Sequence, residues 1–251
     1  MKYKNIIINN NKISYILNNK SNDGCKISVV FLCGYNSDKS GKKAKYLSQL
    51  RKEFGFEYLR FDYSGHGKST GNINNLLLSD WINESKIIIE NITKYPLIII
   101  GSSMGGWIAF YLTTIIKRKV LAVIGISTAV DFTSYILKNL SKKNFIKYMK
   151  EKKVIINSNY SSSPYIFTKN FIDDSKRFFL LNNKNKIICK STLLFGLEDD
   201  SVPLTSQVQL LEKINNTNVS LIISKKSDHR MSSKYDLNLI KITLYNYIKN
   251  S

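Results

Sequence analysis

The chain has 251 residues, 43% of them hydrophobic and 12% aromatic, with a formal net charge of +20. This length and composition exclude a disordered protein and fit one α/β domain with a sizeable core. With only three prolines and twelve glycines to build a flexible linker, we expect a single domain over residues 1–251.

The positive charge is carried mostly by lysine. Only five of the 38 basic residues are arginine, the residue that bidentate phosphate recognition favours. The lysines are spread along a chain rich in asparagine and isoleucine, a composition that an AT-rich genome encodes. We therefore interpret the charge as compositional and expect no nucleic-acid partner. The run from Lys142 to Lys153 is the best candidate for a basic patch, and we interpret it as a solvated helix face.

The cysteines give no sign of a disulfide framework or of a zinc site. They are odd in number and contain no C-x-x-C pair, which favours a reducing compartment. No cluster of His, Cys and Asp has metal-ligand spacing, and Gly65-x-Gly67 lacks the third glycine of a phosphate loop. We therefore expect no metal and no cofactor. The three cysteines are Cys25, Cys33 and Cys189.

The start of the chain, Met1–Lys4, leads directly into a strand pattern. It has neither the apolar core of a signal peptide nor an Arg-rich amphipathic extension. No apolar run approaches the length of a membrane span. We expect a cytoplasmic protein without a signal or transit peptide and without stable membrane insertion.

Strand and helix patterns alternate through most of the chain. Two short apolar runs on either side of Asn9–Lys12 predict a hairpin. Amphipathic helices are predicted between the later strands, which makes the chain a mostly parallel eight-stranded sheet with helices on both faces. The six later strands are predicted at Ile27–Cys33, Glu57–Asp62, Leu97–Ile100, Val120–Ile126, Ile187–Phe195 and Val219–Ser224.

The alternation stops after Asp131. Residues 132–185 mix Phe, Tyr and Lys, and we expect helices and loops there. We interpret this segment as a lid, or cap, inserted over the carboxyl edge of the sheet. A separate small domain is the alternative, but no linker bounds the segment.

The predicted strand Leu97–Ile100 runs into Gly-Ser-Ser-Met-Gly, and a helical pattern follows. Strand, sharp turn and helix are the context that the G-x-S-x-G nucleophile elbow requires. Glycines two residues either side of the serine permit a tight, strained turn. We predict that Ser103 is a nucleophile; the alternative is a Gly-rich turn that only packs tightly.

A serine nucleophile needs a base, and the chain has two histidines. His229 follows the last predicted strand and so lies at the same sheet edge as Ser103. His66 lies between two glycines in what reads as a structural turn. We predict His229 as the base.

Asp199 is predicted to orient His229. It lies in the turn after a predicted strand, in the chain order Ser, Asp, His. Asp200 is better placed to cap the following helix, and Asp131 follows an earlier strand at the same edge. Asp228 directly precedes His229, and adjacent side chains in an extended segment point apart.

The oxyanion of an acyl-transfer reaction needs two N–H donors. The backbone of Met104, next after Ser103, is predicted to supply one. The other is predicted from Tyr35, in the loop that follows the strand Ile27–Cys33.

Four motifs resemble the α/β-hydrolase superfamily: Arg60–Gly65, Gly101–Trp107, Gly196–Pro203 and Ser227–Met231. Within the superfamily they are similar to the branch of the mitochondrial palmitoyl-protein thioesterase, also an acyl-glucuronide esterase, and its bacterial relatives. The resemblance runs from about Val29 to the C-terminus and is weakest in the lid. It implies the α/β-hydrolase fold, a triad at the positions predicted above, and mitochondria or another organelle as an alternative to the cytoplasm.

These predictions combine into a serine hydrolase that cleaves carboxylic ester or thioester bonds through an acyl-enzyme. Its substrates would be small-molecule or acyl-protein esters and thioesters. The alternatives are a serine aminopeptidase or a C–C bond hydrolase on the same fold. A non-catalytic hydrolase-like binding protein is a further alternative, against which the intact Ser, Asp and His set weighs.

Overall fold

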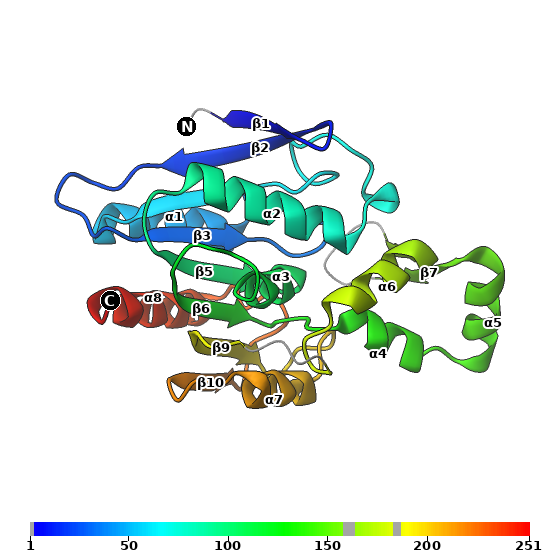
Figure 1. The fold of residues 1–251 in the computed structure, drawn as a ribbon. Coiled ribbons are helices and arrows are strands. Elements are labelled where there is room, and N and C mark those ends of the chain that lie inside the picture. The colour runs from blue at the N-terminus through cyan, green and yellow to red at the C-terminus, as the bar shows by residue number, and fades with distance from the viewer. Residues whose placement is uncertain (1–2, 158–163, 183–186) are drawn as a thin grey trace.

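The computed structural model describes residues 3–157, 164–182 and 187–251. At its centre lies an eight-stranded sheet with the order β1-β2-β4-β3-β5-β6-β9-β10 (Figure 1). Strand β2 is antiparallel to both of its neighbours, and the pairs from β4 to β10 are all parallel. The predicted mostly parallel eight-stranded α/β sheet is confirmed. The strands are β1 (Lys4–Ile8), β2 (Asn11–Asn18), β3 (Ser28–Leu32), β4 (Glu57–Phe61), β5 (Leu97–Ser102), β6 (Val120–Ile126), β9 (Lys190–Gly196) and β10 (Val219–Ser224).

The central strands are buried along their whole length. Every residue of β3, β4 and β5 is buried, because helices cover both faces of the sheet, and such strands read as continuous apolar runs. The polar exceptions are paired: the Ser28 hydroxyl donates to the Glu57 carboxylate at 2.6 Å.

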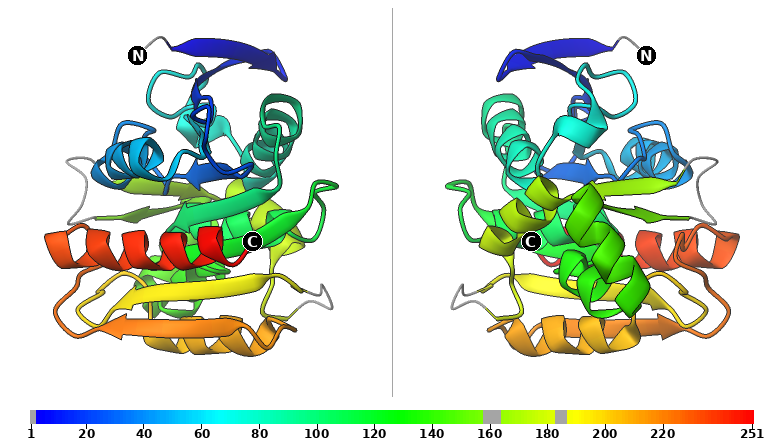
Figure 2. Two further views of the ribbon diagram at one scale, coloured as in Figure 1. Left: turned by 90° about the vertical axis from the view of Figure 1, so that its left-hand side faces the viewer. Right: turned by 90° about the vertical axis from the view of Figure 1, so that its right-hand side faces the viewer.

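Five long helices cover the sheet. Helices α1 and α8 pack together on one face, and α2 and α3 pack together on the other (Figure 2). Helix α3 is buried on nearly every side, as expected for a helix that is apolar all round. The helices are α1 (Lys42–Phe54), α2 (Leu78–Ile92), α3 (Met104–Leu112), α7 (Leu204–Lys213) and α8 (Lys234–Lys249), with a 3₁₀ turn η1 at Ile73–Asn75.

The chain between β6 and β9, residues 127–189, is called the inserted segment here. It extends beyond the carboxyl ends of β5 and β6, where the turns that follow the parallel strands lie (Figure 1). Its elements are α4 (Phe132–Lys138), α5 (Lys142–Glu151), β7 (Lys153–Ile156), β8 (Tyr165–Thr168), α6 (Lys169–Ser175) and the 3₁₀ turn η2 (Lys176–Phe178).

The expectation of only helices and loops in this segment was wrong for β7 and β8, which pair as an antiparallel hairpin. Both runs are rich in β-branched and aromatic residues, which favour a strand once they can pack on a neighbour. Strand β9 begins at Lys190; Ile187, its predicted first residue, forms an isolated bridge with Ile214. The parts of the predicted lid at residues 158–163 and 183–185 lie outside the described residues.

Within the part of the chain that the structure describes, no helix is both long enough and apolar enough to cross a membrane.

Candidate active site

Ser103 lies at the apex of the turn between β5 and α3, in a strained backbone conformation. Its φ of 55° and ψ of −124° fall where L-residues are rare. The surrounding backbone holds it there: Ser103 N–H donates to the Ile126 carbonyl at 2.9 Å, and Ala129 N–H donates to the Ser103 carbonyl at 3.1 Å. This is the sharp turn that the G-x-S-x-G pattern predicts.

The two glycines of the motif are required by close backbone packing. A Cβ on Gly105 would collide with the carbonyls of Leu32 and Cys33 at the end of β3, and a Cβ on Gly101 would collide with the Gly105 carbonyl. The elbow therefore packs directly against the neighbouring strand.

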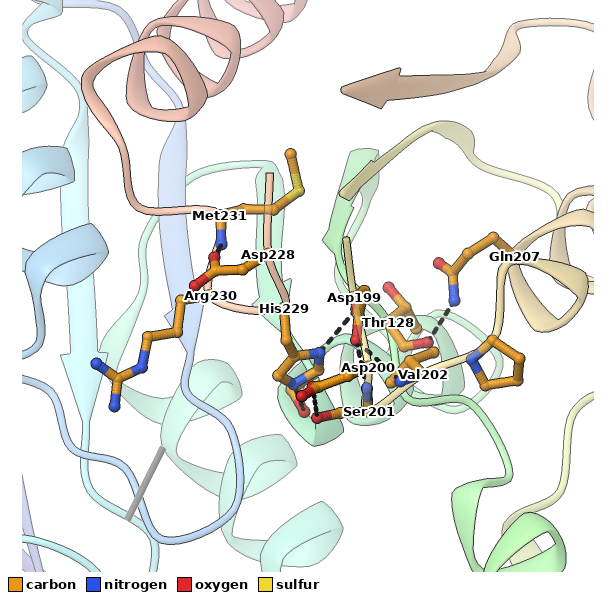
Figure 3. A network of polar contacts seen from close by, with 12 residues as sticks. Thr128, Asp199, Asp200, Ser201, Val202, Gln207, Asp228, His229, Arg230 and Met231 are labelled. Carbon is orange, nitrogen blue, oxygen red and sulfur yellow. Dashed lines mark hydrogen bonds and ion pairs between the residues drawn. The ribbon is translucent and has the colours of Figure 1, made fainter. Parts of the chain in front are cut away.

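The structure brings Ser103, His229 and Asp199 together from three separate turns. His229 Nδ1 lies 2.8 Å from Asp199 Oδ2 (Figure 3). His229 Nε2 lies 3.0 Å from Ser103 Oγ. An ionised carboxylate can only accept, so Nδ1 carries the proton and Nε2 is left to accept from the Ser103 hydroxyl. The Asp199 side chain is fully buried and the His229 ring is 14% exposed.

Asp199 is fixed by the backbone of its own turn. Its Oδ1 accepts the N–H groups of Ser201 and Val202, both at 2.9 Å, while Oδ2 faces His229 (Figure 3). Both carboxylate oxygens therefore have partners, and the orientation toward His229 is fixed.

The turn that carries His229 is held in place by a side chain from another element, α1. The Lys43 ammonium, from the first turn of α1, donates to the Arg230 carbonyl and contacts Ser232 Oγ at 3.4 Å. Burial lowers the pKa of Lys43 to about 8. Sequence reasoning missed this residue, because a contact across 187 residues leaves no local pattern.

The competing carboxylates have other partners. Asp228 accepts the Met231 N–H at 3.1 Å and points away from the His229 ring (Figure 3). Asp200 accepts the Ser201 hydroxyl at 2.9 Å. The expectation that Asp200 caps α7 was wrong, because Pro203 is the N-cap and makes no side-chain cap bond.

Asp131 is buried on the inserted-segment side of β6. Its carboxylate accepts the N–H groups of Leu180 and Leu181 at 2.9–3.2 Å, and so ties the end of the inserted segment to its start, just after β6. Burial nonetheless raises its pKa from 3.8 to about 6.

This pKa makes Asp131 a source of pH-dependent stability. The folded protein holds the Asp131 proton more tightly than the unfolded chain, so stability should fall as the pH rises from about 4 to about 6. We expect the free energy of unfolding of Asp131→Asn to fall by up to roughly 3 kcal/mol less over this pH range than that of the wild type. Urea unfolding of the wild type and the variant at pH values between 4 and 6 measures this difference. If the free energy of unfolding changed equally with pH in both proteins, Asp131 would not be the group responsible.

His66, the other histidine, is buried and fully bonded to backbone. Its Nε2 accepts the Asn36 N–H at 3.1 Å, so Nδ1 carries the proton and donates to the Ser64 carbonyl at 3.0 Å. Burial lowers its pKa, which favours this neutral form. His66 therefore supports the loop next to Tyr35, a role that its sequence context left open.

The two residues predicted to supply the oxyanion donors both lie close to Ser103. Met104 is the first residue of α3, so its N–H has no acceptor within the helix. Tyr35 follows Gly34, where a Cβ would lie 3.1 Å from Ser103 Cβ. The Tyr35 hydroxyl donates to the Ile166 carbonyl of β8 at 3.1 Å, which links this loop to the inserted segment.

Ser103 and His229 open into a pocket of about 950 Å³ between the sheet edge and the inserted segment. Its apolar and polar lining residues come largely from different segments of the chain, which we call the apolar side and the polar side. The apolar side comes from the inserted segment and includes Phe132 and Ile136 of α4, Leu140 just after it, and Val154 and Ile156 of β7. The polar side is lined by Asp38, Lys42, Lys43, Asp200, Arg230 and Ser232.

No group of three or more His, Cys, Asp or Glu residues within the described ranges is arranged to hold a metal ion. The expectation of no cofactor stays a prediction.

Comparison with known families and proteins gives consistent matches. The family described as "Serine aminopeptidase, S33" matches residues 25–177. The Bos taurus protein named "Palmitoyl-protein thioesterase ABHD10, mitochondrial" is 33% identical over 218 residues, which are 86% of this chain and 71% of the relative. The Homo sapiens protein of the same name is 33% identical over 223 residues, with the same shares.

Solved structures agree. The alpha/beta hydrolase domain-containing protein 10 from mouse superposes with a TM-score of 0.90 at 26% identity, covering 100% of this chain and 99% of the other. Est1E from Butyrivibrio proteoclasticus, with ferulic acid bound, superposes with a TM-score of 0.80 over 98% of both chains. At 15% identity the latter shows a common fold alone.

Proposed function

We propose, from the premise that this chain belongs to the serine aminopeptidase S33 family of the α/β-hydrolase superfamily, that it cleaves carboxylic ester or thioester bonds. The resemblance stated from the sequence motifs, to the α/β-hydrolase superfamily and to its palmitoyl-protein thioesterase branch, is thereby confirmed. The observation that carries the proposal is the contact of Ser103 with His229 and of His229 with Asp199, at 3.0 and 2.8 Å.

In the proposed reaction Ser103 Oγ attacks the acyl carbonyl while its proton passes to His229 Nε2. The tetrahedral intermediate collapses, and the same proton passes to the leaving thiol or alcohol. Water then attacks the acyl-enzyme, with His229 accepting a proton from it. The second tetrahedral intermediate collapses with cleavage of the Ser103–acyl bond, and His229 returns the proton to Ser103 Oγ as the carboxylic acid leaves. Asp199 stabilises the imidazolium that forms in each step and keeps the ring in the required tautomer.

The intermediate needs stabilisation of its negative oxygen. We assign this to the N–H groups of Met104 and Tyr35, with the positive end of α3 adding to the first of them. The support comes from position: Met104 is the first helical residue after Ser103, and Tyr35 is tethered on both sides. His66 accepts the N–H of the next residue, Asn36, and Ile166 accepts the Tyr35 hydroxyl.

Tyr35→Phe tests this tether. The variant keeps the ring in its aromatic surroundings but loses the bond to the Ile166 carbonyl, so the backbone donor is less firmly placed. We expect turnover to fall about tenfold, less than the loss of a whole donor, with little change in KM. Steady-state kinetics measures this, with Tyr235→Phe on exposed α8 as the control; an unchanged kcat would contradict the role.

We propose that the inserted segment is a lid over the pocket and that the acyl group lies along its apolar side. Phe132 and Ile136 of α4, with Leu140 just after it, supply that surface. The leaving group then departs over the polar side, past Lys42 and Arg230.

Serine aminopeptidase activity is a second candidate function, because the matching family carries that description. An aminopeptidase must hold a free ammonium group near the nucleophile. The described pocket lining has three cations, Lys42, Lys43 and Arg230, against the carboxylates Asp38 and Asp200. This excess of positive charge disfavours a substrate ammonium group and favours an uncharged acyl group. It therefore supports ester and thioester substrates.

Two measurements test the proposal. A fluorophosphonate probe should label Ser103, located by peptide mass spectrometry, since a non-catalytic scaffold would not react. A panel of p-nitrophenyl esters, acyl thioesters and aminoacyl anilides should then show turnover of the first two classes. Turnover of the anilides alone would overturn the proposal that the protein cleaves ester or thioester bonds.

The compartment stays a prediction. The cattle and human relatives are named as mitochondrial, whereas the cysteine pattern of this chain favours a reducing compartment such as the cytoplasm. All three cysteines are free thiols in the structure, which fits a reducing compartment, whether the cytoplasm or the mitochondrial matrix.

A further inference from the structure

Helix α5 is exposed on nearly every side. Of its ten residues only Tyr148 is buried, and Figure 1 shows the helix at the far end of the inserted segment, away from the sheet. It is nevertheless a well-formed helix, since the Ser141 hydroxyl caps it by accepting the Asn144 N–H at 3.2 Å.

The exposed surface of α5 is apolar where an isolated surface helix would be polar. Phe145, Ile146 and Met149 are 46%, 61% and 47% exposed, and Ile155 on the adjoining β7 is 47% exposed. We call these four side chains the α5 patch. Residues 145, 146 and 149 follow the i, i+1, i+4 spacing of one helical stripe, so they present a single continuous face.

Lysines surround this stripe. Six of the twelve residues from 142 to 153 are lysine, and the one acid, Glu151, lies 3.9 Å from Lys147. Lys143 and Lys150 lie three and four residues from Ile146, along its border. A lysine-rich composition explains the charge but not the exposed Phe, Ile and Met between the lysines.

We propose that the α5 patch docks this protein on the surface of an anionic lipid bilayer. Apolar side chains on a basic helix enter the headgroup region while the lysine stems reach back to the lipid phosphates. The segment uses lysine and no arginine, which suits many loosely placed phosphates and not one fixed bidentate site. Docking on a second copy is disfavoured, because a two-fold interface would set the same lysines against each other.

The α5 patch adjoins the pocket. Asn144 of α5 and Ile155 of β7 both line it. A docked molecule would therefore hold the apolar side of the pocket close to the hydrocarbon, giving an acyl chain a short route to Ser103. This last step rests on the proposed function, whereas the docking does not.

The test is sedimentation of the full chain with lipid vesicles. We expect binding at least about tenfold tighter to vesicles with about one-third phosphatidylglycerol than to phosphatidylcholine alone. Phe145→Ser/Ile146→Ser/Met149→Ser should lose at least about tenfold of that affinity, and so should Lys143→Glu/Lys150→Glu. The matched control is Ile188→Ser/Ile223→Ser/Ile242→Ser, which changes three exposed apolar residues elsewhere and should bind as the wild type does.

The outcomes of this experiment distinguish docking on anionic lipid from self-association and from the proposed hydrolase function. Equal binding to both vesicle types, or wild-type binding by the α5 serine variant, would overturn docking on anionic lipid. A dimer by light scattering that the serine variant abolishes, without vesicle binding, would assign the patch to self-association instead. Vesicle binding does not depend on hydrolysis, so it holds or fails independently of Ser103 labelling.

Discussion

Replacing Ser103 by alanine should lower ester and thioester turnover by about six orders of magnitude. The variant keeps the elbow backbone but removes the oxygen that forms the acyl-enzyme, and comparable triads lose ~10⁶ in kcat on this change. Alanine also leaves His229 Nε2 without the hydroxyl that lies 3.0 Å away. The residual rate, from binding and the oxyanion donors, should still exceed the uncatalysed reaction.

Burst-phase and steady-state assays with p-nitrophenyl esters measure the change, and fluorophosphonate labelling should disappear with it. Ser220→Ala, on an exposed position of β10, is the control and should keep wild-type turnover. Near wild-type hydrolysis by the Ser103 variant would exclude the proposed mechanism altogether. Equal melting temperatures would show that the loss is chemical.

Asp199→Asn should cost about 10⁴ in kcat, by analogy with a triad in which an asparagine imposes the wrong histidine tautomer. The amide N–H₂ can donate to Nδ1, which would then push the proton to Nε2, where it faces Ser103 and cannot accept. Oδ1 can still accept from Ser201 and Val202, so the turn itself should persist.

The neighbouring carboxylate provides the comparison. Asp200→Asn should change kcat by less than about tenfold, because Asp200 bonds the Ser201 hydroxyl and an exposed side chain of this kind contributes little electrostatically. If Asp200→Asn or Asp131→Asn caused the large loss of kcat and Asp199→Asn did not, that other aspartate would be the residue that orients His229.

The candidate site was predictable because its members follow strand ends. Parallel strands bring their carboxyl ends to one edge, so Ser103 after β5, Asp199 after β9 and His229 after β10 could be grouped from local patterns alone. The choice between two histidines was equally local, since only one of them follows the last strand.

Other features depend on contacts that no short window contains. The hairpin β7–β8 forms from two short runs whose helical and strand patterns are ambiguous until they pair. The bond from Asn36 to His66 spans 30 residues, and that from Lys43 to the Arg230 carbonyl spans 187. Pro203, not Asp200, occupies the N-cap position of α7 and makes no side-chain cap bond there.

The separation of Ser103 from His229 by 126 residues has a consequence for the chain during its synthesis. The ribosome releases Ser103, the proposed nucleophile, and the loop of Tyr35 long before His229, the proposed base. Domains fold as units as they emerge, and β10 is the edge strand that brings His229 to the other two residues. Under the proposed mechanism, a nascent or truncated chain therefore holds Ser103 without its base, and Ser103 becomes reactive only when the last strand joins the sheet.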